Sequence, residues 1–153
     1  MIKIFTIIIL FFLDLISKKL IFHFIDLNTF QFLMFFVDIA HIHNYGVSFG
    51  LFSGLIPAWI FVVIGLVISV IIFYMMIKSR KNIEKWGFLL ILAGALSNII
   101  DRALNSYVID FIYLHYKDFY WPAFNFADIY ISIGVCIILF QYFRDIKIKK
   151  VIN

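Results

Sequence analysis

Residues 57–77 read PAWIFVVIGLVISVIIFYMMI, a nearly continuous apolar run that contains no charged side chain. A helix of about 20 residues crosses the hydrocarbon core of a bilayer, because each residue adds about 1.5 Å of rise. Proline at the start suits the first helical turn, where its missing N–H costs no hydrogen bond. This stretch therefore predicts a transmembrane helix, and the rest of the chain is interpreted around it.

The composition supports a membrane environment for most of the chain. Of 153 residues, 65% are hydrophobic and 14% are charged, whereas soluble domains average about 45–50% apolar and about 25% charged residues. This argues against a soluble globular fold and against disorder. The net charge of +4 does not indicate nucleic-acid binding, because most basic residues gather in two short segments, 78–85 and 144–150, which are typical of cytoplasmic anchors.

Three further apolar runs predict spans over about 2–22, 86–103 and 123–143, in addition to 57–77. The first resembles the core of a signal peptide, but no small-residue cleavage site follows, so we expect a retained helix. Four spans place Lys3, the basic loop and the basic tail on one side, with both termini cytoplasmic. We expect one integral membrane domain over residues 1–153.

Two segments are then expected at the outer surface. Residues 23–56 are rich in Phe and Ile with poor helical periodicity, which indicates a mixed region of strands and loops. Residues 104–122 carry several tyrosines and a tryptophan, whose rings suit a membrane interface.

Ionisable residues within spans are costly and are therefore usually paired, hydrated or functional. Here they fall near the outer ends of the predicted spans: Asp14, Lys18, Asp101, Arg102, Asp110 and Asp128. Helical spacing groups Asp14 with Lys18, Asn98 with Asp101 and Arg102, and Asn125 with Asp128. The topology therefore gathers several polar faces at one membrane surface.

Two interpretations of these residues remain open from the pattern alone. In one, Asp14–Lys18 and Asp101–Arg102 are neutralised structural pairs. In the other, Asp110 and Asp128, which lie in apolar surroundings without adjacent basic residues, form a catalytic dyad. Two carboxylates in a low-dielectric cleft tend to share one proton, and such a pair can activate water against a peptide bond.

Five ordered motifs resemble those of the lipoprotein signal peptidases (signal peptidase II), across nearly the whole chain. They are Asp14-Leu-Ile-Ser17-Lys18, Asn44-Tyr-Gly46-Val-Ser-Phe49-Gly50, Ala93-Gly94-Ala-Leu-Ser-Asn98-Ile-Ile-Asp101-Arg102, Val108-Ile-Asp110-Phe111 and Phe124-Asn125-Phe-Ala127-Asp128. Each motif alone is weak, but their order on a four-span frame is specific.

This resemblance implies an aspartic endopeptidase of the bacterial plasma membrane, with its active site near the outer surface. Its substrate would be a prolipoprotein, cut before a cysteine that carries diacylglycerol. We expect a monomer in contact with membrane lipid and no cofactor or metal. The resemblance implies Asp110 and Asp128 as the catalytic pair. Site-supporting or substrate-binding roles are implied for Asp14, Lys18, Asn44, Gly46, Asn98, Asp101, Arg102 and Asn125.

The resemblance also implies a fold class. We expect an all-α membrane protein of four transmembrane helices, with a small extracytoplasmic β-cradle over 23–56 and a short outer helix within 104–122. The chain departs from the family at Ala93 and Ser97, where glycine is usual, and at Ile129, where a small hydroxyl residue is common. Ile129 has no hydroxyl group, so it cannot form the hydrogen bond that such a residue would provide beside the site.

The four histidines and the one cysteine are not expected to take part in a reaction or to bind a metal. His41 and His43, two residues apart without a third ligand, are more typical of a strand than of a metal site, and the isolated His23 and His115 are interpreted in the same way. The single cysteine, Cys136, is expected to be a small apolar residue.

The main alternative function is a small proton- or ion-coupled transporter, although that would favour charges near the bilayer midplane and an internal repeat. A purely structural membrane protein would leave Asp110 and Asp128 unexplained.

Overall fold

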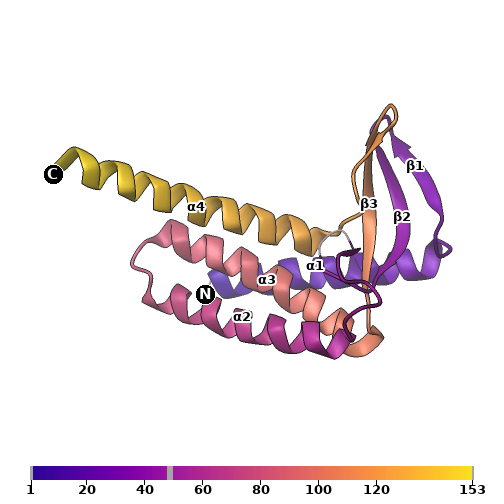
Figure 1. Cartoon of the computed structure of the whole chain (residues 1–153), viewed down its shortest axis with the longest axis horizontal. Helices are drawn as coiled ribbons and strands as arrows, with labels where there is room; N and C mark the ends of the chain where they lie inside the picture. Colours follow the sequence, from indigo (N-terminus) through magenta and orange to yellow (C-terminus); the bar gives the residue numbers. More distant parts are fainter. Residues whose placement is uncertain (1, 48–49, 153) are drawn as a thin grey trace.

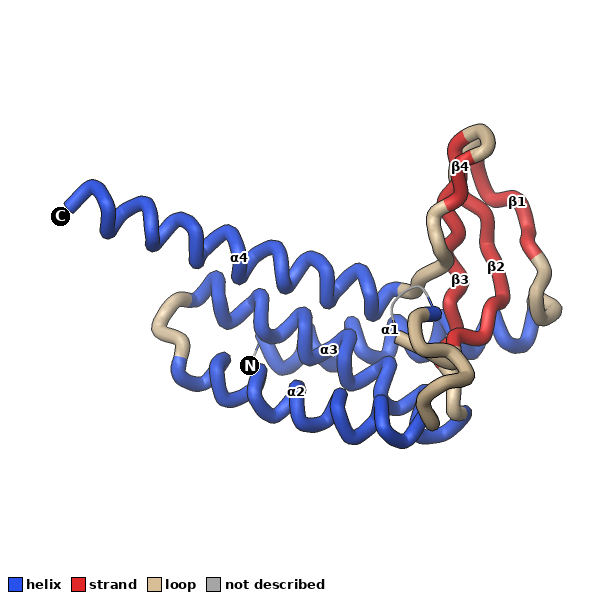
Figure 2. The backbone as a smooth tube through the Cα atoms, in the orientation of Figure 1, coloured by secondary structure: helices blue, strands red, loops and turns tan. Residues whose placement is uncertain are grey.

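The computed structural model describes residues 2–47 and 50–152. Its elements are α1 (Ile2–Phe24), β1 (Phe30–Met34), β2 (Val37–Asn44), α2 (Ala58–Lys78), α3 (Asn82–Asn105), β3 (Val108–Tyr116), β4 (Phe119–Tyr120) and α4 (Phe126–Ile152). The helices run side by side, and the strands stand across one end of them (Figure 1 and Figure 2). One helix overlaps each predicted span. Ser48 and Phe49 of the second motif, and the side chains of Lys149 and Lys150 in the basic tail, lie outside the described residues.

Helix α3 is the central helix and packs against α1, α2 and α4. Glycines allow α3 and α4 to approach closely, because a Cβ on Gly94 would lie 2.3 Å from the Ala127 carbonyl oxygen. A Cβ on Gly134 would likewise lie 2.5 Å from the Gly87 carbonyl oxygen. Small residues at such contacts let membrane helices pack backbone to backbone. This packing brings the C-terminal half of α3 beside the first turn of α4.

The strands form one antiparallel sheet in the order β1-β2-β3-β4. The expected strands within 23–56 are therefore present as β1 and β2. The short helix expected within 104–122 is wrong, because residues 108–116 form β3, and the protein is mostly helical rather than all-α. Helix α3 ends where Ser106 adopts a left-handed conformation, at a φ of 68°. The β-branched and aromatic residues that follow favour a strand, and β2 provides the partner for their backbone hydrogen bonds.

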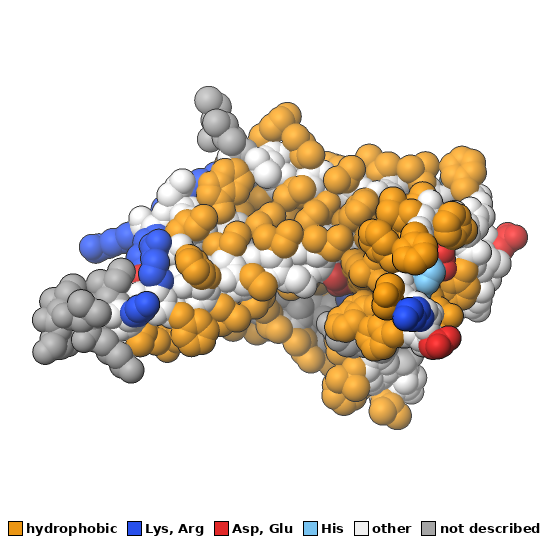
Figure 3. All heavy atoms as spheres, turned by 90° about the horizontal axis from the view of Figure 1, so that it is seen from above, with side chains coloured by type: hydrophobic (Ala, Val, Ile, Leu, Met, Phe, Trp, Pro, Cys, Tyr) orange, Lys and Arg blue, Asp and Glu red, His pale blue; other side chains and the backbone are white. Residues whose placement is uncertain are grey.

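Among the described residues, three helical segments are long and apolar enough to cross a membrane: Ala58–Lys78, Asn82–Asn105 and Phe126–Lys147. Helix α1 has a comparable length, but Asp14, Lys18 and Lys19 interrupt its apolar sequence. Hydrophobic side chains cover the sides of the bundle, whereas Lys and Arg gather at the end opposite the sheet (Figure 3). An apolar outer surface of this extent suits lipid rather than water.

Candidate active site

Asp110 lies on β3 and is almost completely buried, with 3% of its surface exposed. One carboxylate oxygen accepts a hydrogen bond from the Asn125 amide at 2.7 Å, and the other accepts one from the Asn44 amide at 2.9 Å. Asn44 is the last residue of β2, and its own side-chain oxygen accepts the Gly46 N–H at 2.9 Å. This turn after β2 holds the Asn44 amide so that it can reach Asp110.

Asp128 lies in the first turn of α4 and forms a reciprocal cap with Asn125. The Asp128 N–H donates to the Asn125 side-chain oxygen at 3.0 Å, and the Asn125 N–H donates to Asp128 Oδ2 at 3.2 Å. Such a capping box satisfies N–H groups that the first helical turn leaves free. The remaining oxygen, Oδ1, accepts a hydrogen bond from the Asn98 amide of α3 at 3.0 Å. The start of α4 therefore fixes the direction of the Asp128 carboxylate.

Asn125 connects the two aspartates. It is fully buried, its side-chain oxygen is bonded to the Asp128 N–H, and its side-chain nitrogen is bonded to Asp110. Both aspartates line one cavity of about 340 Å³, together with Asn44 and Asn98. The structure thus places two carboxyl groups from different elements around one asparagine and one cavity.

Burial away from water raises the pKa of Asp110 to about 7, and the negative charge of Asp128 adds to the rise. The hydrogen bonds from Asn44 and Asn125 oppose it, because they stabilise the ionised form. Near neutral pH, Asp110 can therefore hold or release a proton, as a general acid or base requires.

A buried ionic cluster lies next to this cavity. The Lys18 ammonium group is 2.7 Å from Asp14, 2.8 Å from Asp101 and 2.8 Å from the Asn98 side-chain oxygen. Lys18 is 1% exposed, so these three partners stabilise its charge in place of water. Removing one partner would leave a buried charge incompletely paired and would lower the stability of the fold. The cluster orients Asn98, whose amide nitrogen then contacts Asp128.

Asp14 joins three helices through its carboxylate. Besides Lys18 on its own helix, it accepts the Ser97 hydroxyl of α3 at 2.6 Å and the Ala127 N–H of α4 at 2.9 Å. The sequence predicts Ser97 only as a small residue at a helix contact and does not predict this hydrogen bond. Its helical position, four residues before Asp101 and therefore on the same face, was the available signal.

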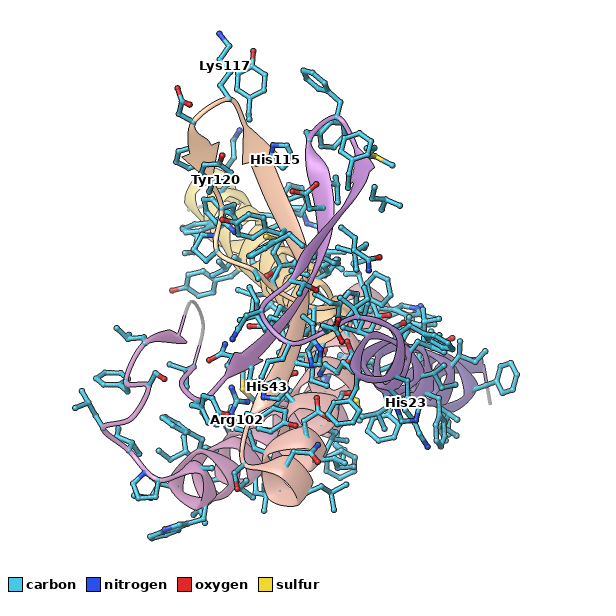
Figure 4. All side chains as sticks on the ribbon, turned by 90° about the vertical axis from the view of Figure 1, so that its right-hand side faces the viewer. His23, His43, Arg102, His115, Lys117 and Tyr120 are labelled. Atoms are coloured by element: carbon cyan, nitrogen blue, oxygen red, sulfur yellow. The ribbon has the colours of Figure 1, made fainter. Side chains whose placement is uncertain are left out.

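Arg102 lies in the last turn of α3, where the sheet meets the helices (Figure 4). Its guanidinium donates to the Gly46 carbonyl oxygen at 2.7 Å. Asp101 forms its ion pair with Lys18, so the Asp101–Arg102 pair of the first of the two open interpretations is not found among the described residues. Arg102 lines the aspartate cavity and also a larger neighbouring cavity of about 950 Å³. The positive charge of Arg102 therefore lies at the boundary between the two cavities.

One network of hydrogen bonds and ion pairs includes every predicted site residue. The predicted residues in it are Asp14, Lys18, Asn44, Gly46, Asn98, Asp101, Arg102, Asp110, Asn125 and Asp128, and Ser97 and Ala127 join it through Asp14. Ile129, where the family often has a hydroxyl residue, lines the aspartate cavity. In the part of the chain that the structure describes, no group of three or more His, Cys, Asp or Glu residues could hold a metal ion.

Residues 6–144 match the family model described as Signal peptidase (SPase) II, Peptidase_A8. The chain belongs to the signal peptidase II family. It is 43% identical over 131 residues to the lipoprotein signal peptidase of Thermodesulfovibrio yellowstonii, covering 85% of each chain. It is 34% identical to that of Teredinibacter turnerae over 142 residues, covering 90% of this chain and 84% of the relative.

Two solved structures, both described as bacterial membrane enzymes, have the same fold. One matches with a TM-score of 0.86 at 28% identity, covering 94% of this chain and 88% of that chain. The other matches with a TM-score of 0.83 at 28% identity, covering 94% and 93%. Membership of this family makes the chain a signal peptidase II-type protease of the bacterial inner membrane with a prolipoprotein substrate, and it favours the peptidase over the transporter.

Proposed function

We propose that the chain is an aspartic endopeptidase in which Asp110 and Asp128 form the catalytic pair. The observation that carries this proposal is that Asn125 bonds to both carboxyl groups at the edge of one cavity. Family membership supports the substrate class, and we propose that the prolipoprotein is cut before its diacylglyceryl-modified cysteine.

The pair acts with one shared proton. The ionised carboxylate accepts a proton from water as the water oxygen attacks the scissile carbonyl carbon, while the protonated carboxyl donates a hydrogen bond to the carbonyl oxygen. A carboxyl group then protonates the departing amine as the C–N bond breaks. The proton belongs to the pair rather than to one residue, because two interacting groups titrate together.

The lipid on the substrate accounts for a site at the end of the bundle. Its acyl chains remain in the bilayer, and each buried CH₂ group contributes about 0.8 kcal/mol to anchoring. The scissile bond is then held near the membrane surface, at the depth we propose for the aspartates. Substrate can enter laterally from lipid, so no aqueous channel is required.

We propose four spans, with α1 as the first, and both termini in the cytoplasm. Two contacts support a common end for the basic segments: Lys3 of α1 is bonded to Asn82 at the start of α3, and Lys81 is paired with Asp145 of α4. The positive-inside rule assigns that end to the cytoplasm. The aspartates, near the sheet, then face the outer side, and the enzyme acts as a monomer.

Cleavage of a lipid-modified precursor in vitro tests the proposed pair. Asp110→Asn and Asp128→Asn each remove a group that must exchange a proton, so we expect cleavage to fall by about 10²–10⁴-fold or more. The matched control is Asp118→Asn in the exposed turn between β3 and β4, which should keep normal activity. Thermal unfolding in detergent checks that all variants fold. Substantial cleavage by either site variant would overturn the proposal.

A chelator separates this mechanism from metal-assisted hydrolysis. We expect EDTA to leave the cleavage rate unchanged, because the proposed steps use only carboxyl groups and water. Strong inhibition that added Zn²⁺ reverses would instead indicate a metal in the reaction.

A further inference from the structure

His41 and His43 form a second cluster of ionisable side chains, outside the network around the aspartates. They lie on the same face of β2, because side chains two residues apart in a strand point to the same side. Their Nε2 atoms are 3.1 Å apart. His41 is buried, and the His43 ring is stacked on Tyr107 with 3.6 Å between ring centroids. Both rings are thus held by their surroundings.

The contact of His41 with α1 defines which ring nitrogen is free. His41 Nδ1 is 2.7 Å from the Ile25 carbonyl oxygen, just after the end of α1. A carbonyl oxygen only accepts, so Nδ1 carries the hydrogen and the neutral ring presents a lone pair at Nε2. Histidines that bind metals commonly donate their other N–H to a backbone carbonyl in this way. His41 is therefore oriented as a metal ligand, with its lone pair toward His43.

The separation of the two nitrogens fits a shared metal ion. Bonds of about 2.0–2.1 Å from zinc to nitrogen put two ligand atoms about 2.9 Å apart at a right angle and about 3.3 Å apart at the tetrahedral angle. The observed 3.1 Å lies between these values. We propose that His41 and His43 bind one divalent ion of the Zn²⁺ type through their Nε2 atoms.

Binding requires only a tautomer change at neutral pH. Without metal, the His43 Nε2–H donates to the lone pair of His41. With metal, that hydrogen moves to His43 Nδ1, and both Nε2 lone pairs bind the ion, so no net proton is released. Because the described residues contain no larger cluster of metal-binding side chains, water completes the coordination. His43, but not His41, lines a cavity of about 290 Å³, which provides space for water on the His43 side of the site.

The site prefers late first-row transition metals. Imidazole nitrogen suits Zn²⁺, Cu²⁺ and Ni²⁺, whereas Mg²⁺ and Ca²⁺ prefer oxygen ligands. The ion would tie His43 to His41, and through His41 to the end of α1. His43 immediately precedes Asn44, which bonds to Asp110. Because the ion would link β2 to the end of α1 through His41, bound metal would raise the Tm of the protein, and it would take no part in cleavage.

Zn²⁺ titration of the full-length protein in detergent, followed by calorimetry, tests the proposal. The informative variant is His43→Gln, because a glutamine amide can keep the hydrogen bond to His41 but has no imidazole lone pair. We expect one Zn²⁺ per wild-type chain, a higher Tm with Zn²⁺ but not with Mg²⁺, and at least tenfold weaker binding by His43→Gln. His115→Gln is the matched control on β3, where the ring lies 3.4 Å from Asp38, and it should bind Zn²⁺ normally.

Cu²⁺ provides a second measurement that counts the ligands. Electron paramagnetic resonance should show two coordinating nitrogens in the wild type and one in His43→Gln. Wild-type protein that binds no Zn²⁺ at micromolar concentration, equal affinity in His43→Gln, or loss of binding only in His115→Gln would each overturn the proposal. None of these measurements uses cleavage, so they leave the test of the aspartate pair independent.

Discussion

At the scale of one residue, burial moves the pKa of the Asp110 carboxyl group into the range that acid–base catalysis near neutral pH requires. Its pKa rises from 3.8 to about 7 mainly because the side chain has lost its water. The folded state therefore holds this proton more tightly than the unfolded chain does. Between about pH 4 and 7 the stability contributed by this group falls as pH rises.

The same shift predicts the pH dependence of cleavage. The proposed catalytic pair would need one shared proton, so we expect kcat/KM for a lipid-modified precursor to fall as the pH rises above about 7. A pH series at constant ionic strength measures this limb. Activity that keeps rising to about pH 9 would contradict a protonated pair at neutral pH.

Lys18 supplies a second prediction at this scale. Lys18→Met removes the cation between the buried carboxylates of Asp14 and Asp101, and we expect a loss of about 3–5 kcal/mol in the free energy of unfolding. Lys19→Met changes the exposed neighbour on the same helix and should alter stability by less than about 0.5 kcal/mol. Denaturation in detergent compares the two, and equal effects would contradict a role for the cluster in stability.

At the scale of elements, the site depends on two contacts between neighbours. The antiparallel pairing of β2 with β3 sets Ile42 opposite Asp110 and Asn44 opposite Val108, which brings the Asn44 amide within reach of Asp110. The close packing of α3 on α4 brings Asn98 within reach of Asp128. Asn125, just before α4, joins the two contacts.

Gly94 tests the contact between α3 and α4. In Gly94→Ala the new methyl group meets a backbone oxygen, that of Ala127, at 2.3 Å, so α4 must shift beside Asp128. We expect a loss of about 1–3 kcal/mol in stability together with a marked loss of cleavage.

Gly65→Ala is the matched control for this change. Its methyl group meets only the flexible side chain of Ile99, at 2.8 Å, and should affect stability and cleavage less. Unfolding and cleavage assays on both variants measure the difference. Normal cleavage by Gly94→Ala would show that the first turn of α4 tolerates displacement.

At the scale of the whole molecule, the charge distribution predicts the orientation in the membrane. Basic side chains gather at one end of the bundle, and the sheet stands at the other (Figure 1 and Figure 3). We expect reporter fusions at residue 82 and at the C-terminus to report the cytoplasm, and a fusion near residue 115 to report the outer side. The reverse pattern would separate the aspartates from their substrate.

Much of the architecture followed from local sequence. Apolar runs and helical spacing predicted the four helical segments, and polar residues at i, i+3 and i+4 predicted which side chains share a face. The apolar runs and the helical spacing depend on neighbours along the chain, which a single sequence contains. The resemblance of the motifs to signal peptidase II, rather than spacing alone, implied the ten site residues that the structure joins in one network, including Asp110 and Asp128.

Contacts between distant segments required the tertiary structure. Asp101 is bonded to Lys18 rather than to Arg102, and Ser97 donates to Asp14, because helix packing determines which faces meet. Residues 108–116 contain β-branched and aromatic residues that favour a strand, but their backbone hydrogen-bond partners come from β2, which local propensity does not describe. Spacing in the sequence thus determined which side chains share a face, and only packing across some 80 residues decided which of those faces came together.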